Sequence, residues 1–276
     1  MKTTKLVMLF ITAFTFCFFL IRCEKQQMIT IRVQGSTTIE PFMRKVSKEF
    51  QTNRNVTFEI SAPGSRSGIN ALIDGKCDIA MSSMEILPEQ AAEAREKGIS
   101  VKPFLLGYDI IIPIVHPSNS VSDISFDDLK KVYRGELKNW ADLGGGESAI
   151  DVVDRGHSSG TYNVWHHTVA PPEPAESLYT VKPSNSSVLA WVSEHPDAIG
   201  YVSAAYLNPE VKPLTLDGIA MTENDSLLSE YHLKRPLFLY VNEEKFDKNI
   251  KTFIIFLIIN DRGRELLRDA GFFYNS

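Results

Sequence analysis

The sequence predicts an α/β protein of two lobes, each with a mostly parallel sheet, joined by a two-strand hinge. Strand and helix patterns alternate along nearly the whole chain after residue 28, which favours parallel strands covered by helices. Two long apolar runs, near residues 104–115 and 235–242, bracket a middle block of such units. With 276 residues, 43% of them apolar and 23% charged, the chain is long enough for two cores.

The two long runs predict where the chain crosses between the lobes. The simplest path leaves the first lobe, builds the second and returns. It places a cleft between the lobes, where small ligands usually bind. The predicted boundaries are residues 28–107 with 241–276 for lobe 1, residues 108–240 for lobe 2, and crossings near 107–112 and 236–241.

The first third of the chain predicts a βαβαβα unit. Helix 39–51 shows the clearest pattern, because Ile39, Phe42, Met43, Val46 and Phe50 fall on one face. Gly75 and Gly98 end the other two helices. The expected strands are 28–35, 55–63 and 77–83, and the expected helices are 39–51, 67–76 and 87–98.

The rest of the chain continues the alternation. The run 101–117 is too long for one ordinary strand, so it is expected to pass from one sheet into another. The C-terminal region is expected to form one or two helices, with "FIIFLII" as a core segment far shorter than a membrane span. The expected helices lie in 125–146, 160–169, 186–197 and 250–272, and the expected strands are 149–155, 198–207, 211–218 and 235–242.

Residues 1–22 predict a signal peptide. Lys2 and Lys5 precede an apolar run from Leu6 to Ile21, a charged start followed by a short apolar core. The run is slightly shorter than the about 20 apolar residues of a membrane-spanning helix, so an uncleaved anchor is the alternative. We therefore expect export to the periplasm or the cell surface.

Cys23 follows this run in "LIRC", which resembles a bacterial lipoprotein box, where a Leu stands three residues before an acylated Cys. Arg22 departs from the pattern, which has a small residue just before the Cys. Two outcomes stay open: a lipid anchor at Cys23, or a protein without one. With Cys23 acylated, only Cys77 remains in the mature chain. No internal disulfide is then expected, and Cys77 is interpreted as a small buried apolar residue.

Charge argues against nucleic acid as a partner. The formal net charge is −5, and it falls to −8 once Lys2, Lys5 and Arg22 leave with the signal peptide. There is no basic run to bind phosphate backbones. An acidic protein still binds small anions where local dipoles favour them.

Four turns share one pattern in which a strand runs into a turn of small hydroxyl residues that opens a helix. They are "VQGSTTIEP", "SAPGSRSGIN", "CDIAMSSME" and "VDRGHSSGTYN". Each turn offers hydroxyls and backbone N–H groups at a helix start, which carries about half a positive charge. Several such starts that converge make an anion site with few cations.

Each turn alone has a simpler interpretation. Thr37 and Glu40 fit a capping box, and Ser65 and Ser67 fit ordinary turn residues. Arg155 favours the anion site, because a guanidinium offers a fork of donors to an oxyanion at the end of a strand. Its neighbour Asp154 is the expected partner of that guanidinium.

A hydrolase is the rival interpretation. "GHSSG" fits G-x-S-x-G with Ser158 at the centre, and His195 or His232 follows as a candidate base. No HGGG-like oxyanion segment accompanies it, and the other three turns stay unexplained. A metal site is weaker still, since His166 and His167 point about 100° apart on a helix. We expect no catalytic residue, metal or cofactor.

At the four turns the chain resembles the phosphate-binding subunit of bacterial phosphate ABC transporters, a periplasmic solute-binding family. The resemblance covers nearly all of residues 29–276, and "VYRGELKNW" and "DRGHSSGT" are its most specific segments. It implies two α/β lobes with a hinge, as in periplasmic binding proteins. It also implies one phosphate held in the cleft and delivered to a membrane permease, with the binding protein expected as a monomer.

The resemblance also implies which residues bind the anion. The first three turns supply the Thr37 hydroxyl, the Thr38 backbone, Ser65 and Ser83. The last turn supplies Arg155, Ser159, Gly160 and Thr161.

One position departs from well-known phosphate binders, which carry an Asp where this chain has Ser83. A carboxylate there accepts the remaining proton of phosphate and repels sulfate, which has none. We therefore expect weaker discrimination between phosphate and sulfate, unless Glu40, Glu85 or Asp109 reaches the cleft. Sulfate, molybdate and other oxyanions stay open as ligands, and so does service to a sensor or adhesin instead of a permease.

Overall fold

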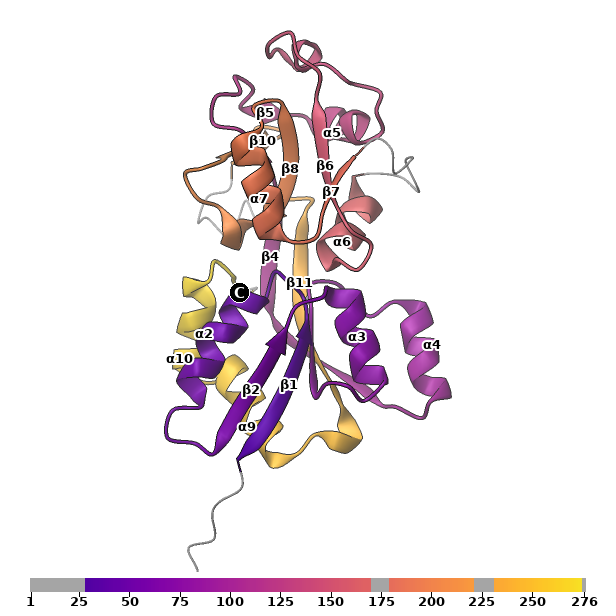
Figure 1. The fold of residues 1–276 in the computed structure, drawn as a ribbon, viewed down its shortest axis with the longest axis vertical. Helices are drawn as coiled ribbons and strands as arrows, with labels where there is room; N and C mark the ends of the chain where they lie inside the picture. The colour runs from indigo at the N-terminus through magenta and orange to yellow at the C-terminus, as the bar shows by residue number, and fades with distance from the viewer. Residues whose placement is uncertain (1–27, 170–178, 221–230, 275–276) are drawn as a thin grey trace, which may run out of the picture.

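The computed structural model describes residues 28–169, 179–220 and 231–274, so the predicted signal peptide and Cys23 lie outside the described residues. Strands and helices gather in two groups along the long axis (Figure 1). We call them lobe 1 and lobe 2. One nine-stranded sheet runs through both in the order β2-β1-β3-β11-β4-β8-β6-β7, with β9 added beside β4.

Lobe 1 is built from the predicted βαβαβα unit and the C-terminal helices, with β1 parallel to both β2 and β3. All five apolar residues predicted on one face of α2 are buried. Phe50 and Phe58 close this core around Phe253, with ring centroids 4.9 and 4.6 Å from it. The elements are β1 (Ile29–Gly35), α2 (Glu40–Phe50), β2 (Val56–Ser61), α3 (Ser65–Ile73), β3 (Ile79–Ser82), α4 (Pro88–Glu96), η4 (Glu243–Lys245), α9 (Lys248–Ile258) and α10 (Asp261–Asp269).

Lobe 2 has its own core, separate from that of lobe 1. Trp165 stacks on Tyr201 at 4.0 Å between centroids, and Tyr133 meets Trp165 edge-on at 4.9 Å. The elements are β5 (Asp123–Ile124), α5 (Phe126–Tyr133), η1 (Trp140–Leu143), β6 (Asp151–Arg155), α6 (Gly160–Thr168), β7 (Thr180–Lys182), α7 (Asn185–Glu194), β8 (Ala198–Ser203), η3 (Ala204–Tyr206), β9 (Lys212–Pro213) and β10 (Thr215–Leu216).

Two antiparallel strands, β4 (Val101–Val115) and β11 (Lys234–Asn242), run between the lobes (Figure 1). The run that was expected to pass from one sheet into another is a single strand, β4, of one continuous sheet. It pairs with β11 along its first part and with β8 further along. Arg235 faces Asp109 across this pair of strands. The lobe boundaries in residue numbers stay a prediction.

The predicted strand 211–218 is instead two short strands. β9 pairs with β4, whereas β10 pairs with β5 in a separate two-stranded sheet. The chain changes partners at Leu214, which is buried and donates its N–H to the Pro113 carbonyl at 2.9 Å. The sequence pattern predicts an extended backbone, but it does not predict which strand each part of the run pairs with.

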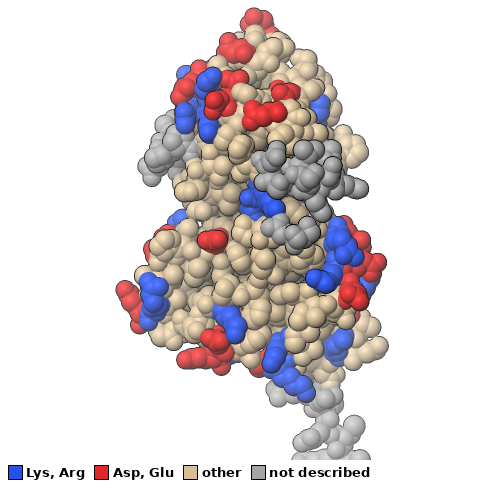
Figure 2. All heavy atoms as spheres, turned by 180° about the vertical axis from the view of Figure 1, so that it is seen from behind, with Lys and Arg blue, Asp and Glu red and all other residues tan. Residues whose placement is uncertain are grey.

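Charged side chains of both signs are spread over the molecule. Figure 2 shows Lys and Arg interspersed with Asp and Glu on the face it draws, without a continuous basic tract. Across the described ranges, no helix has the length and apolar character needed to cross a membrane.

Candidate oxyanion-binding site

The carboxyl ends of β1, β3 and β6 meet between the lobes, together with the starts of α2, α3 and α6. Open α/β sheets bind ligands at such strand ends. The structure brings together all eight residues predicted for the site, and their role in ligand binding stays a prediction. Their side chains are almost fully buried, with at most 9% exposed. They are Thr37, Thr38, Ser65, Ser83, Arg155, Ser159, Gly160 and Thr161.

The lobe 1 side of the site is a connected set of hydroxyls. Ser36 Oγ donates to Ser83 Oγ at 3.1 Å, and Ser65 Oγ accepts the backbone N–H of Ser83 at 3.1 Å. The Thr38 N–H donates back to Ser36 Oγ at 3.1 Å. Gly35 allows this approach, because a Cβ there would lie 2.0 Å from the Met81 carbonyl oxygen. Three turns from separate parts of the sequence therefore form one surface.

The capping-box interpretation of Thr37 and Glu40 is wrong. The N-cap residue of α2 is Ile39, which makes no side-chain capping bond. Thr37 Oγ1 accepts instead from Arg155 Nη2 at 3.1 Å, and Glu40 pairs with Arg44 on the surface. The Thr37 hydroxyl is thus committed to the region between the lobes.

Arg155 is the cation on the lobe 2 side and is 1% exposed. Its Nη1 donates to Asn185 Oδ1 at 3.2 Å, and its Nη2 also donates to the Pro183 carbonyl at 3.0 Å. Its Nε is buried and has no hydrogen-bond partner among the described residues. Burial lowers the pKa of Arg155 to about 10, so the guanidinium stays charged at neutral pH.

The expectation that Asp154 holds the Arg155 guanidinium is wrong. The Asp154 carboxylate contacts the Tyr201 hydroxyl, His166 Nε2 at 2.7 Å and only the backbone N–H of Arg155. Successive side chains on a strand point to opposite faces, so Asp154 enters the core of lobe 2 while Arg155 enters the site.

The start of α6 forms the lobe 2 side of the site, opposite the hydroxyls of lobe 1. Ser159 is the N-cap residue, and its Oγ accepts the Tyr162 N–H at 3.2 Å, so this hydroxyl supports the helix. Thr161 Oγ1 lies 3.4 Å from Thr38 Oγ1 in lobe 1. A Cβ on Gly160 would lie 2.4 Å from Ser65 Oγ and 2.6 Å from Ser83 Oγ. The two lobes therefore touch at Gly160.

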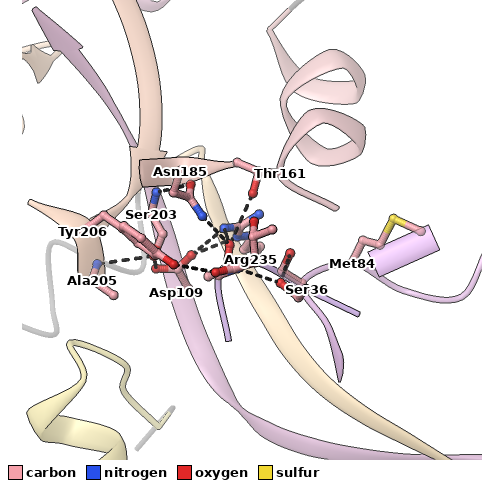
Figure 3. A network of polar contacts seen from close by, with 12 residues as sticks. Ser36, Met84, Asp109, Thr161, Asn185, Ser203, Ala205, Tyr206 and Arg235 are labelled. Atoms are coloured by element: carbon pink, nitrogen blue, oxygen red, sulfur yellow. Dashed lines mark hydrogen bonds and ion pairs between the residues drawn. The ribbon is translucent and has the colours of Figure 1, made fainter. Parts of the chain in front are cut away.

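The structure adds three polar residues that the sequence interpretation missed, Asn185, Ser203 and Arg235, and it brings in Asp109, which was named only as a possible acceptor. These four residues come from β4, β11, α7 and the end of β8, and Figure 3 shows Asn185, Ser203 and Asp109 beside Arg235. Arg235 donates from Nε and Nη2 to Asp109 Oδ2 at 3.0 and 2.7 Å. Ser203 Oγ donates to Asp109 Oδ1 at 2.7 Å, and Asn185 Nδ2 to Thr38 Oγ1 at 3.1 Å. In the sequence, Arg235 is marked only by its position next to residues 236–241, where the chain was predicted to cross between the lobes.

The arrangement has the chemistry of an anion cradle. Arg155 Nε and Arg235 Nη1 are buried donors that have no partner among the described residues. Buried N–H groups are nearly always paired in proteins. Two unpaired guanidinium N–H groups in a region that also contains hydroxyls and helix starts therefore indicate a site for a ligand that accepts hydrogen bonds. Among the residues that the structure describes, no three His, Cys, Asp or Glu side chains are placed to hold a metal ion.

The hydrolase interpretation finds no support in the same geometry. His195 contacts the Trp191 carbonyl and stacks on its indole, and His232 is exposed and stacks on Phe126. Neither ring serves Ser158. The Ser158 carbonyl instead accepts the Arg66 N–H at 3.1 Å, which joins lobe 2 to the start of α3.

A two-lobed α/β fold with a polar cradle between its lobes defines a solute-binding protein. The chain belongs to the PBP superfamily, because the family model described as PBP superfamily domain matches residues 24–261. The fold-class prediction and the predicted family resemblance are both confirmed.

Several proteins named for phosphate are similar to this chain. The phosphate-binding protein PstS of Borreliella burgdorferi is 28% identical over 255 residues, 88% of each chain. PstS of Bacillus subtilis is 28% identical over 261 residues, 90% of this chain and 82% of the relative. A substrate-binding protein of a phosphate ABC transporter from Clostridium perfringens, solved with bound phosphate, matches with a TM-score of 0.81 and 28% identity. That match covers 90% of this chain and 100% of the other.

Two of these relatives are named as phosphate-binding proteins and the third as a substrate-binding protein of an ABC transporter. The prediction that the chain is not an enzyme is therefore confirmed by kinship.

Proposed function

We propose that this protein is exported, captures phosphate between its lobes and delivers it to an ABC transporter permease. The observation that carries the proposal is the pair of buried, unpartnered guanidinium N–H groups, on Arg155 and Arg235, beside hydroxyls from three turns. The names of the relatives supply phosphate as the anion.

The geometry also supports a capture mechanism. Lobe 1 contributes hydroxyls and lobe 2 contributes Arg155 with the start of α6, so an anion that touches both sets is held only when the lobes meet. The hydrogen bond from Arg155 Nη2 to Thr37 Oγ1 and the contact of Thr38 with Thr161 join the same two lobes. Binding and closure are thus one event, which lets a permease distinguish the loaded protein from the free one.

The direct test is calorimetry of the mature protein with phosphate, sulfate and molybdate. We expect saturable binding of phosphate at one site per chain, with small-angle scattering that reports a more compact molecule in its presence. An absence of heat with phosphate would overturn the proposal. A monomer is expected in both states, which the same scattering measurement checks.

Export and anchoring need a separate test in the native host. A labelled lipid precursor should enter the wild-type protein, and Cys23→Ser should abolish the label while leaving phosphate binding intact. Label that is absent from the wild type would mean that Arg22 prevents acylation. Loss of phosphate uptake on deletion of a neighbouring permease gene would support service to a transporter over a sensor or adhesin.

A further inference from the structure

Arg235 holds an unusual position for a surface-type residue. It lies on β11 where this strand passes between the lobes, opposite Asp109 on β4. Its side chain is 1% exposed and that of Asp109 is fully buried. A buried ion pair is costly to desolvate, so it is weak evidence of stabilisation by itself and invites a search for another role.

The hydrogen bonds of Arg235 show which way its fork faces. Asp109 Oδ2 accepts hydrogen bonds from Arg235 Nε and from one N–H of Nη2. The other N–H of Nη2 donates to Thr38 Oγ1 at 3.1 Å. In a planar guanidinium this second N–H shares an edge with Nη1. The Nη1–Nη2 edge therefore faces Thr38, a residue of the predicted site, and Nη1 is the nitrogen without a partner.

The Asp109–Arg235 pair is not the two-oxygen, two-nitrogen pair that is common in purely structural Arg–Asp pairs. Asp109 Oδ1 accepts from the Ser203 hydroxyl, so a single oxygen, Oδ2, serves Arg235. Ser203 in turn donates its backbone N–H to Asn185 Oδ1, which also receives Arg155 Nη1. The two arginines thus belong to one hydrogen-bond network, and Figure 3 shows the part of it around Arg235.

We propose that Arg235 is a second ligand-binding cation, that Asp109 is the residue which positions it, and that the site is thereby built for a doubly charged tetrahedral oxyanion. This inference rests on the proposed function. Both guanidinium groups keep a buried donor without a partner among the described residues, Arg155 Nε and Arg235 Nη1. Arg235 bonds Thr38, whose hydroxyl lies 3.4 Å from that of Thr161. A second buried cation strengthens attraction for each unit of ligand charge in a site that excludes water.

The test replaces the pair as a unit, because removing one member would leave a buried charge uncompensated. The double variant Asp109→Asn/Arg235→Gln removes both charges together and leaves an uncharged polar side chain at each position. The matched control is Asp78→Asn/Arg32→Gln in lobe 1, a second Arg–Asp pair with two side-chain hydrogen bonds at 2.9 and 3.2 Å. Thermal unfolding of both variants checks that each is folded.

Three tetrahedral probes then separate charge from shape: inorganic phosphate, sulfate with two charges, and perchlorate with one. We expect the double variant to bind phosphate and sulfate at least about tenfold more weakly, with a much smaller loss for perchlorate competition. The control variant should match the wild type with all three. Equal losses for sulfate and perchlorate would mean that the pair only shapes the site.

The outcomes also separate this inference from the proposed function. A wild type that binds no phosphate would remove the proposed function itself. A wild type that binds phosphate, with a folded double variant of equal affinity, would overturn only the role of Arg235. An intermediate variant, Arg235→Lys, should recover part of the preference for sulfate over perchlorate, because it retains the charge without the planar fork.

Discussion

The two lobes contribute different chemistry to the same site. The lobe 1 residues, Ser36, Thr37, Thr38, Ser65 and Ser83, present hydroxyls and helix starts. Lobe 2 presents a cation, Arg155, and the crossing strands add Arg235 with Asp109. Attraction by charge is thus concentrated on one side, whereas the uncharged side offers many oriented donors. The difference suggests that charge sets how strongly an anion is held and that the hydroxyls set its orientation.

The largest effect is expected from removing the cation of lobe 2. Arg155→Ala should weaken phosphate binding by at least about 2 kcal/mol, because it deletes charged hydrogen bonds in a desolvated site. The fold should survive, since Arg155 lies at the end of β6 and not in the apolar core. Calorimetry measures the loss, and Arg44→Ala, which removes a surface cation of lobe 1, is the control. Unchanged affinity would exclude Arg155 from the site.

The next effect concerns the point where the two sides touch. Gly160→Ala would place a Cβ 2.4 Å from Ser65 Oγ and 2.6 Å from Ser83 Oγ, so the lobes should no longer meet without a shift. We expect phosphate affinity to fall by about tenfold, through faster dissociation, with little change in thermal stability. Gly146→Ala is the control, since nothing lies within 4 Å of a Cβ at that glycine. Identical dissociation rates in both variants would contradict closure at Gly160.

A smaller effect tests selectivity on the uncharged side. The Ser83 hydroxyl accepts from Ser36 and lies 3.3 Å from Ser65 Oγ, and it is neutral. It therefore offers no carboxylate that would favour a protonated anion over sulfate. Excess sulfate should therefore compete with phosphate in the wild type. Ser83→Asp should weaken sulfate binding at least about fivefold more than phosphate binding, whereas Ser83→Asn, of equal size, should affect both alike.

The structure narrows the alternatives to this selectivity prediction. Glu40 is paired with Arg44 and Glu85 is exposed, while Asp109 is occupied by Ser203 and Arg235. Burial raises the pKa of Asp109 above its ordinary range. Sulfate that fails to compete even with the wild type would show that a carboxylate nevertheless reaches the ligand, and the selectivity argument from Ser83 would then be wrong.

The smallest effect is expected at the end of α3 away from its start at Ser65. Lys76 and Lys97 lower the pKa of Asp74 from its ordinary value of 3.8 to about 2. Their contribution to stability is therefore present above pH 3.8 and is lost as the pH falls toward 2. Asp74→Asn should lower Tm by no more than about 2 °C at neutral pH, because the groups are exposed. Phosphate affinity should not change. A change would mean that the charge of Asp74 influences the anion site at the other end of α3.

Local sequence patterns predicted the uncharged side of the site well. The hydroxyl turns stand directly after strands, and strand and helix periodicity fixes where each turn lies, as the buried face of α2 also illustrates. Asn185, Ser203 and Arg235 were missed for a physical reason. They come from α7, β8 and β11, and their proximity depends on the order and register of strands far apart in the sequence. The break between β9 and β10 was missed for the same reason.

The meeting of Gly64 with Ser158 has a consequence for the size of the anion. A Cβ on Gly64 would lie 2.4 Å from the Ser158 carbonyl oxygen, and the neighbouring Arg66 N–H donates to that same oxygen. Backbone atoms, which cannot rotate away as side chains do, therefore define how closely the lobes approach. We therefore expect that an oxyanion with longer bonds than phosphate binds only if these backbones separate and this hydrogen bond is lost. We expect the main-chain contact between Gly64 and Ser158 to limit the radius of the anion that the closed protein accepts.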